Sequence, residues 1–246
     1  MNELRLSGSG TIKGATTNPA DVVFSGGTTN ESVFALTSGS LTLANMTIED
    51  GVGSGSFFDN STTIYDNSGG GINCYGTATA KATLTVDNVE LTGNTANTTA
   101  TVFGFGAGIS ATYCDVSLTD VDINDNTANY APAIALVDGN LNMSNVTIEG
   151  HSSALYTMYT GALRASTTNT WRNVEIVDNE VTSTISTLYT TAGSANSNDI
   201  SGSNITVADN TNTSTTLTGQ MAGWVVDGAD VTLTSPEVTA NDDYGI

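Results

Sequence analysis

The chain has 246 residues, of which 38% are hydrophobic and 12% are charged, and it carries a net charge of −20 with only five Lys and Arg residues. Nucleic-acid binding depends on Lys and Arg contacts to phosphate, so this composition excludes nucleic acid as a partner and argues against an anionic membrane surface. The hydrophobic residues are spaced regularly, which distinguishes the chain from a disordered one.

A frame of nine residues occurs seven times, with mostly aliphatic positions on both sides of a polar corner and a preferred Asn at the end. In chain order the copies cover residues 43–51, 86–94, 118–126, 143–151, 171–179, 202–210 and 233–241. The aliphatic residues alternate with period two before and after the corner, as at Leu41, Leu43, Met46 and Ile48. This pattern predicts two short strands that meet at a bend.

A third strand is predicted upstream of each corner, where small residues precede an aliphatic residue. The segments are Gly70-Gly71-Ile72, Ala107-Gly108-Ile109, Pro132-Ala133-Ile134 and Gly161-Ala162-Leu163, with Phe34 and Trp224 in the same slot. Successive corners lie 25 to 43 residues apart. The variation falls mainly in polar segments after the final Asn, which are predicted loops.

Strands of fixed length joined by one variable loop are typical of a parallel β-helix. We therefore expect an all-β fold, a single-stranded parallel β-helix of about seven coils that forms one domain over residues 1–246. A leucine-rich-repeat-like solenoid is the alternative, because its L-x-x-L-x-L-x-x-N pattern matches the frame, but it requires a helical segment in each repeat.

In either fold an Asn turned inward at a corner can bond to main-chain groups and to its stacked copies. The frame therefore predicts a structural ladder of asparagines. Its members are Asn94, Asn126, Asn179, Asn210 and Asn241, while Gly51 and His151 take the same slot in the other two copies.

We expect the domain to be truncated or open at both ends. The alternation begins at Leu4 and Leu6, and the last residues, 243–246, resemble the start of another strand. Unpaired strand edges predict partners that continue the stack, either flanking repeats of a longer chain or copies of this chain joined head-to-tail. No apolar run reaches transmembrane length and residues 1–4 are not a signal peptide, so any export signal would be absent from this chain.

Two further features concern cross-links and metals. Cys74 and Cys114 fall in adjacent repeats and could form a disulfide, which would fit a secreted chain, with two buried free thiols as the alternative. Oxygen ligands suit calcium, the one cofactor that the sequence suggests. Its candidate ligands share the position before the final residue of the frame and are Asp50, Asp125, Asp178 and Asp209. Asp also favours turns at such a position.

Eight N-x-[ST] sequons make glycosylation of an exported chain a further expectation. The candidates that fall in predicted loops are Asn30, Asn60, Asn97 and Asn212. Asn45, Asn145 and Asn204 occupy the corner, where a glycan fits only if the side chain points outward, and Asn142 completes the set.

An enzyme that acts on polysaccharides would need paired carboxylates, or calcium-bound Asp with a basic partner. The candidates here are His151, the Asp242-Asp243 pair, and Arg164 and Arg172, which could bind an acidic sugar. His151 occupies the slot of the stacked Asn, the Asp pair lacks a partner motif, and the two Arg residues also fit surface positions. We therefore expect no enzyme, with a polysaccharide lyase or hydrolase, or a carbohydrate-binding β-helix, as the alternative.

The repeats resemble those of the chlamydial polymorphic outer-membrane proteins and related adhesin-like proteins, which pair a G-G-A-[ILV] motif with F-x-x-N. The first motif is similar to residues 70–72, 106–109 and 161–163, and the second to residues 91–94, 123–126, 176–179, 207–210 and 238–241. The resemblance implies a right-handed β-helix on an exported protein used for adhesion or structure. We therefore expect a secreted or cell-surface adhesin shaft or fibre subunit, with glycans or a neighbouring cell surface as further partners.

Overall fold

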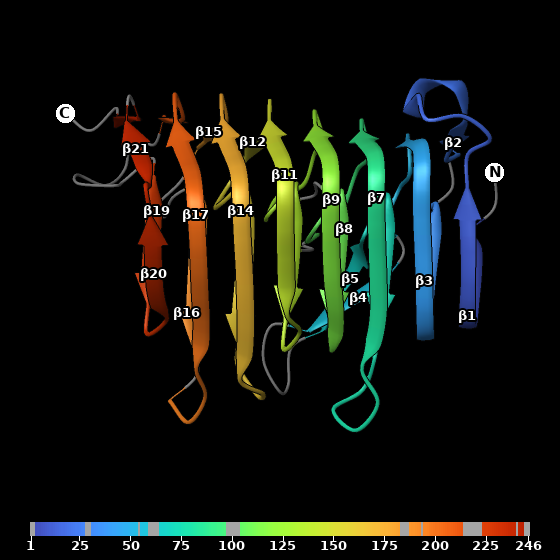
Figure 1. Cartoon of the computed structure of the whole chain (residues 1–246), viewed down its shortest axis with the longest axis horizontal. Helices are drawn as coiled ribbons and strands as arrows, with labels where there is room; N and C mark the ends of the chain where they lie inside the picture. The colour runs from blue at the N-terminus through green and yellow to red at the C-terminus, as the bar shows by residue number, and fades with distance from the viewer. Residues whose placement is uncertain are drawn as a thin grey trace.

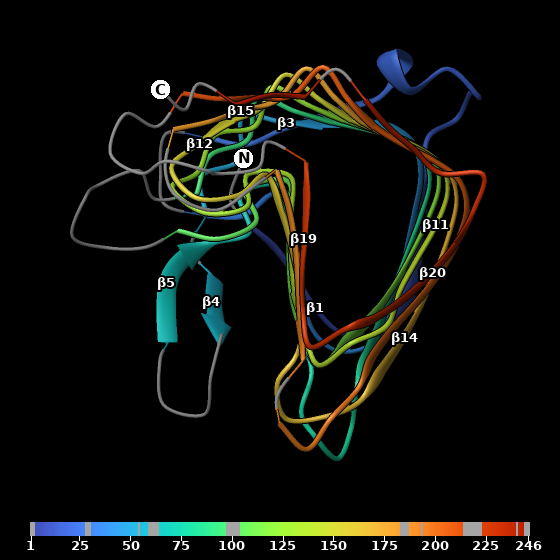
Figure 2. The ribbon, with the colours of Figure 1, turned by 90° about the vertical axis from the view of Figure 1, so that its left-hand side faces the viewer.

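The computed structural model describes residues 3–27, 31–53, 55–58, 64–96, 104–182, 187–192, 194–213, 223–239 and 241–243. Parallel strands from successive repeats lie side by side along the molecule (Figure 1). Viewed along the stack, the chain winds around an interior with a roughly triangular outline (Figure 2). The fold is all-β, and this curled parallel sheet fits a parallel β-helix.

The long strands follow the nine-residue frame and form two of the three sides. They are β3 (Phe34–Glu49), β7 (Ala82–Thr92), β9 (Cys114–Asn124), β11 (Leu141–Glu149), β14 (Thr167–Val177) and β17 (Asn198–Ala208). At the ends of the stack the same path is divided between β1 (Leu4–Lys13) and β2 (Val23–Ser25), and between β20 (Asp230–Thr234) and β21 (Glu237–Thr239).

Shorter strands complete each repeat. The third side continues from the start of β3 through β6 (Ile72–Tyr75), β8 (Ile109–Thr112), β10 (Ile134–Val137), β13 (Met158–Ala162), β16 (Leu188–Ala192) and β19 (Trp224–Asp227). A small parallel sheet follows the ends of the long strands and contains β12 (Ser152–Ser153), β15 (Glu180–Val181), β18 (Thr211–Asn212) and β22 (Asp242–Asp243).

Two elements lie outside this winding path. The antiparallel pair β4 (Gly55–Phe58) and β5 (Ile64–Ser68) projects from the third side (Figure 2). The 3-10 helix η1 (Pro19–Asp21) is the only helix in the described ranges. The leucine-rich-repeat alternative, which needs a helical segment in every repeat, is therefore wrong for the described part of the chain.

The bend in each long strand is made by one residue with a left-handed backbone conformation. Asn45, Asn88, Asp120, Asn145, Asn173, Asn204 and Ser235 have φ between 51° and 56°. The strand pairing skips this residue, as between Ala44↔Asp87 and Met46↔Val89. Asn and Asp tolerate left-handed φ better than other side chains except Gly, so the polar corner in the sequence reflects a backbone requirement.

Every second residue of the strands faces inward, and these side chains fill the interior. Stacked aliphatic side chains, such as Ile48, Leu91 and Ile123, are fully buried and belong to one continuous core. Trp171 and Trp224 stack in the later repeats with ring centroids 5.4 Å apart. Fully burying one Leu or Ile side chain stabilises a fold by about 1.5–3 kcal/mol, so stacking gives each repeat a core that it could not form alone.

The predicted position of one short strand was wrong. The sequence placed Leu163 in the slot of Ile134, whereas the structure pairs Ile134 with Met158. Leu163 follows β13 and packs in a separate outer cluster with Phe105, Tyr156 and Tyr159. The Gly161-Ala162-Leu163 sequence imitates the small-small-aliphatic pattern, but these small residues lie inside the strand instead of before it.

Candidate functional site

The five predicted asparagines form a hydrogen-bonded ladder inside the molecule. Asn126 is typical, because its Oδ1 accepts a bond of 2.9 Å from the main-chain N–H of Asn94, and its Nδ2 donates a bond of 2.9 Å to the carbonyl of Leu91. The same pair of bonds to the preceding repeat recurs at Asn94, Asn179, Asn210 and Asn241. Each amide thus pairs main-chain groups that the turn after the long strand would leave unsatisfied.

His151 takes the place of Asn in this ladder with equivalent bonds. Its Nδ1 lies 3.1 Å from the main-chain N of Asn126, and its Nε2 lies 3.1 Å from the carbonyl oxygen of Ile123. A neutral imidazole with hydrogen on Nε2 therefore accepts and donates as the Asn amide does. Burial lowers the pKa of His151 from 6.5 to about 4, although main-chain bonds to Asn126 and Ile123 and the charge of Asp125 oppose this effect. This environment suits a structural His, because the ring is buried and both of its nitrogens are bonded to the main chain.

Two of the residues that precede the short strands, Gly71 and Gly108, lie against the ladder. A Cβ atom on Gly71 would lie 3.2 Å from the amide carbon of Asn94, and one on Gly108 would lie 3.5 Å from Nδ2 of Asn126. The same Cβ atoms would lie 2.8 Å and 2.6 Å from carbonyl oxygens of the next repeat. The glycines therefore allow adjacent repeats and the ladder to approach closely.

A second ladder runs along the outside of the bend. Nδ2 of Asn145 donates to Asp120 at 2.8 Å, and Oδ1 of Asn145 accepts a bond of 2.8 Å from Asn173. Asn204 and Asn88 donate equivalent bonds to Asn173 and Asn45. In the bend sequons at Asn145 and Asn204, Nδ2 donates a hydrogen bond to the preceding repeat. A glycan would be attached to this same atom.

The other candidate glycosylation sites have mixed outcomes. Asn212, predicted in a loop, lies in β18 with 2% exposure, so that prediction was wrong because the side chain is enclosed between repeats. Asn30, Asn60 and Asn97 lie outside the described residues. Asn142 is exposed on the outer face of β11.

The four candidate calcium ligands do not gather into one site. Asp50, Asp125, Asp178 and Asp209 align along the turn after the long strands, with φ between 51° and 55°. Gly93 and Gly150 separate them in the strand registers, so only Asp178 and Asp209 lie in consecutive repeats. In the described part of the chain, no group of three or more His, Cys, Asp or Glu residues could hold a metal ion. The left-handed turn gives a local reason for Asp at this position.

An acidic hollow of about 350 Å³ lies beside that pair. Asp178, Asp209 and Glu180 line it together with Thr211 and Thr213. Oε1 of Glu180 accepts a bond of 3.0 Å from the hydroxyl of Thr213. Three acidic side chains therefore lie close together beside β15 and β18 of the small parallel sheet.

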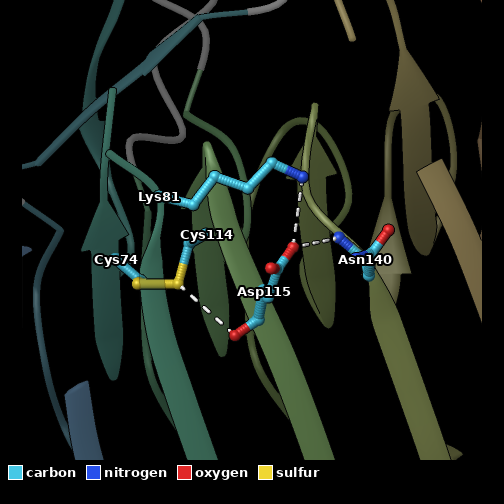
Figure 3. The surroundings of a disulfide bond; sticks show 5 residues. All are labelled: Cys74, Lys81, Cys114, Asp115 and Asn140. Carbon is cyan, nitrogen blue, oxygen red and sulfur yellow. Dashed lines mark hydrogen bonds and ion pairs between the residues drawn. A yellow bond between two sulfur atoms is a disulfide. The ribbon is translucent and has the colours of Figure 1, made fainter. Parts of the chain in front are cut away.

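Cys74 and Cys114 are joined by a disulfide between consecutive repeats (Figure 3). Lys81 and Asp115 form an ion pair of 3.3 Å beside it, and the same oxygen of Asp115 accepts a bond of 2.9 Å from the main-chain N–H of Asn140. Both cysteine side chains are fully buried. The disulfide and these bonds stabilise the junction where the short strands of the third side lead into the long strands.

Arg164, one candidate for binding an acidic sugar, is held within the protein. Its Nε lies 2.6 Å from Oδ2 of the buried Asp138, and its guanidinium carbon lies 4.8 Å from the ring centre of Tyr113. Asp138 also accepts bonds from the main-chain N–H groups of Leu163, Arg164 and Ala165. Sequence reasoning missed this anchor, for which the Asp138-Gly139 turn signal was the only clue.

Arg172, the other candidate, lies on an open surface. It lines a shallow hollow of about 340 Å³ on the outer face of β9, β11 and β14. The other polar side chains of this hollow are Ser117, Thr119, Asn142, Ser144 and Thr170. Leu118 and Met143 contribute to its floor, and their side chains are buried.

The last catalytic candidate is the Asp242-Asp243 pair, which lies in β22 and pairs with Thr211 and Asn212 of β18.

No helix in the described ranges has the length and apolar character needed to cross a membrane. No protein-family model, curated protein or solved structure matches the chain.

Proposed function

We propose that the chain is a non-enzymatic, right-handed, single-stranded parallel β-helix of about seven coils that serves as an adhesin shaft or as the subunit of a head-to-tail fibre. The observation that carries this proposal is the continuous coupling of each repeat to the next. Main-chain pairing on every side, the buried Asn and His ladder and the outer bend ladder all run along the stack axis. Such coupling suits a rod that bears load along its length.

Both ends of the described stack support continuation by another set of repeats. Within the described strands, β1 pairs only with β3, and β20 pairs only with β17. Apolar side chains near these edges are exposed, as at Leu4 (38%), Val226 (46%) and Val238 (52%). Unpaired strand edges with apolar neighbours favour association with a further strand.

The strand registers match the two ends to each other. A second copy that continues the pairing would place Leu233 against Ile12, Val226 against Leu6 and Val238 against Phe24. Flanking repeats of a longer chain would use the same edges.

A location outside the cell is part of this proposal. The Cys74–Cys114 disulfide supports an oxidising compartment, because disulfides persist mainly in secreted and surface proteins. The net charge of −20 keeps a surface rich in Thr, Ser and Asn soluble.

Electron microscopy at several protein concentrations, with and without calcium, tests the assembly. Filaments that lengthen with concentration would support the fibre, whereas stable single rods at every concentration would reject it and leave the adhesin shaft. A Val226→Lys variant should shorten or abolish filaments, because it places a charge in the proposed contact. Thr232→Lys, on the outward face of the same end, is the matched control and should assemble normally. Hydrolysis or elimination of a polysaccharide by the purified chain would contradict the non-enzymatic role.

A further inference from the structure

The polar side chains of the hollow on β9, β11 and β14 have no partners among the described residues. Ser117, Thr119, Asn142, Ser144, Thr170 and Arg172 line it, and none makes a side-chain hydrogen bond or ion pair with the described residues. All six are exposed or half-buried. The neighbouring bend is different, since Asp120, Asn145 and Asn173 bond to one another there. Donors and acceptors in the hollow are therefore available to a ligand.

The charge of the hollow is opposite to that of the molecule. Among 25 acidic residues in the chain, none lines it, and Arg172 is its single charged group. Three other cations are paired, namely Arg5 with Glu3, Lys81 with Asp115 and Arg164 with Asp138. At physiological salt, charges beyond about 8 Å are largely screened, so the nearby charges decide the local field. Arg172 lies inside the hollow, while Asp87 and Asp120 adjoin its opposite edge at Thr119.

The arrangement matches a ligand with many hydroxyl groups and one carboxylate. Three adjacent strands span roughly 10 Å, which accommodates a short saccharide lying across them. Ser, Thr and Asn side chains both donate and accept hydrogen bonds, as sugar hydroxyls do. The planar guanidinium of an Arg binds a carboxylate through two parallel bonds.

We propose that this hollow is a binding site for a short saccharide that carries a carboxylate. Arg172 pairs with the carboxylate, while Asn142 and the surrounding hydroxyls bond to the sugar ring. The site goes beyond the proposed shaft or fibre role and does not depend on assembly. Because it is open and has no aromatic side chain in its lining, we expect affinity in the millimolar range.

The test is a titration of the ¹⁵N-labelled chain with a disaccharide that contains one galacturonic acid residue, followed by amide chemical shifts. The protein should come from a host that does not glycosylate, because Asn142 begins a sequon. Saturable shifts confined to residues 117–119, 142–144 and 170–172 are expected. Absence of saturable shifts, or shifts located elsewhere, would overturn the proposal.

Two comparisons separate a site from general attraction to positive charge. Arg172→Gln should weaken binding about tenfold or more, since it removes a charge-assisted bond. Lys13→Gln removes another exposed cation from the same outward row, at the end of the stack, and should leave affinity within about twofold. The methyl ester of the disaccharide should bind the wild-type chain as weakly as the free acid binds Arg172→Gln.

Equal loss in the two variants, or equal binding of acid and ester, would reject the site. Both variants should keep the wild-type amide spectrum outside the substituted position, which shows that folding is unchanged. A failure of filament formation would leave this titration unaffected, so the two proposals can fail separately.

Discussion

At the scale of single residues, the ladder shows which chemical property the turn requires. Asn126 supplies one acceptor and one donor to main-chain groups of the preceding repeat, and His151 supplies the same pair with a larger ring. Gly51 has no side chain to take part, but its main-chain N–H donates to Oδ1 of Asn94 at 3.0 Å, as the N–H of each later rung donates to the next side chain. The shared requirement is thus hydrogen bonding, with the amide as its commonest source.

The His rung makes stability depend on pH in a defined window. His151 has a pKa of about 4 in the folded chain and an ordinary value of 6.5. Between these values the unfolded state binds more protons, so the free energy of unfolding decreases as pH falls. The contribution of the neutral imidazole is complete above pH 6.5 and is lost by about pH 4, a change of about 3 kcal/mol.

Denaturant unfolding of the wild-type chain and of His151→Asn at pH 7, 5 and 4 measures this effect. Asn keeps the two bonds without a titrating group, so the variant should lose about 3 kcal/mol less than the wild-type chain between pH 7 and 4. Carboxylates titrate in both proteins and cancel in the comparison. Identical pH slopes would show that the ring does not stay neutral in the folded chain.

At the scale of elements, the register depends on how closely strands can approach. Gly71 and Gly108 precede β6 and β8, where an added side chain would meet the ladder and the next repeat. Ala133, Thr157 and Thr187 hold the equivalent position before β10, β13 and β16, so only some repeats require glycine there. The sequence showed the small residues clearly, yet their partner across the interior became visible only in the structure.

Gly108→Ala should therefore destabilise the chain. Its added Cβ would lie 2.6 Å from the carbonyl oxygen of Ala133, so the backbone must shift, with an expected cost of about 1–3 kcal/mol. Gly223→Ala is the matched control, since its Cβ would lie 3.5 Å from the nearest atom and should change stability by less than about 0.5 kcal/mol. Urea unfolding curves of the two variants provide the measurement, and equal effects would contradict the steric explanation.

At the scale of the whole molecule, most repeats are held by non-covalent contacts alone. The described chain contains one covalent cross-link, Cys74–Cys114, between residues 40 apart in the sequence. A parallel stack places its pairing partners far apart along the chain, so its strand contacts are of high contact order. The disulfide restricts the unfolded chain near the middle of this stack.

Reduction of this disulfide should lower the free energy of unfolding by about 3–4 kcal/mol, as estimated from the closed loop. Chemical denaturation with and without a phosphine reductant measures the difference. A Cys74→Ala, Cys114→Ala double variant should be insensitive to the reductant. An unchanged wild-type midpoint under complete reduction would contradict the expected stabilisation.

The sequence by itself determined the repeat, the bend and the ladder, because these depend on local spacing and on backbone conformations that Asn, Asp and Gly adopt readily. It placed Asn94, Asn126, Asn179, Asn210 and Asn241 in one equivalent position of the repeat. It also allowed a disulfide between Cys74 and Cys114 but left free thiols open, since spacing does not place Cβ atoms.

Tertiary structure alone decided which side chains meet across repeats. It paired Met158 with Ile134 and buried Asn212 between repeats. It also showed that Arg164 is paired with Asp138, while Arg172 lines an open hollow and has no partner among the described residues. The physical reason is that loops of unequal length set the sequence distance between repeats, whereas strand pairing sets the distance in space.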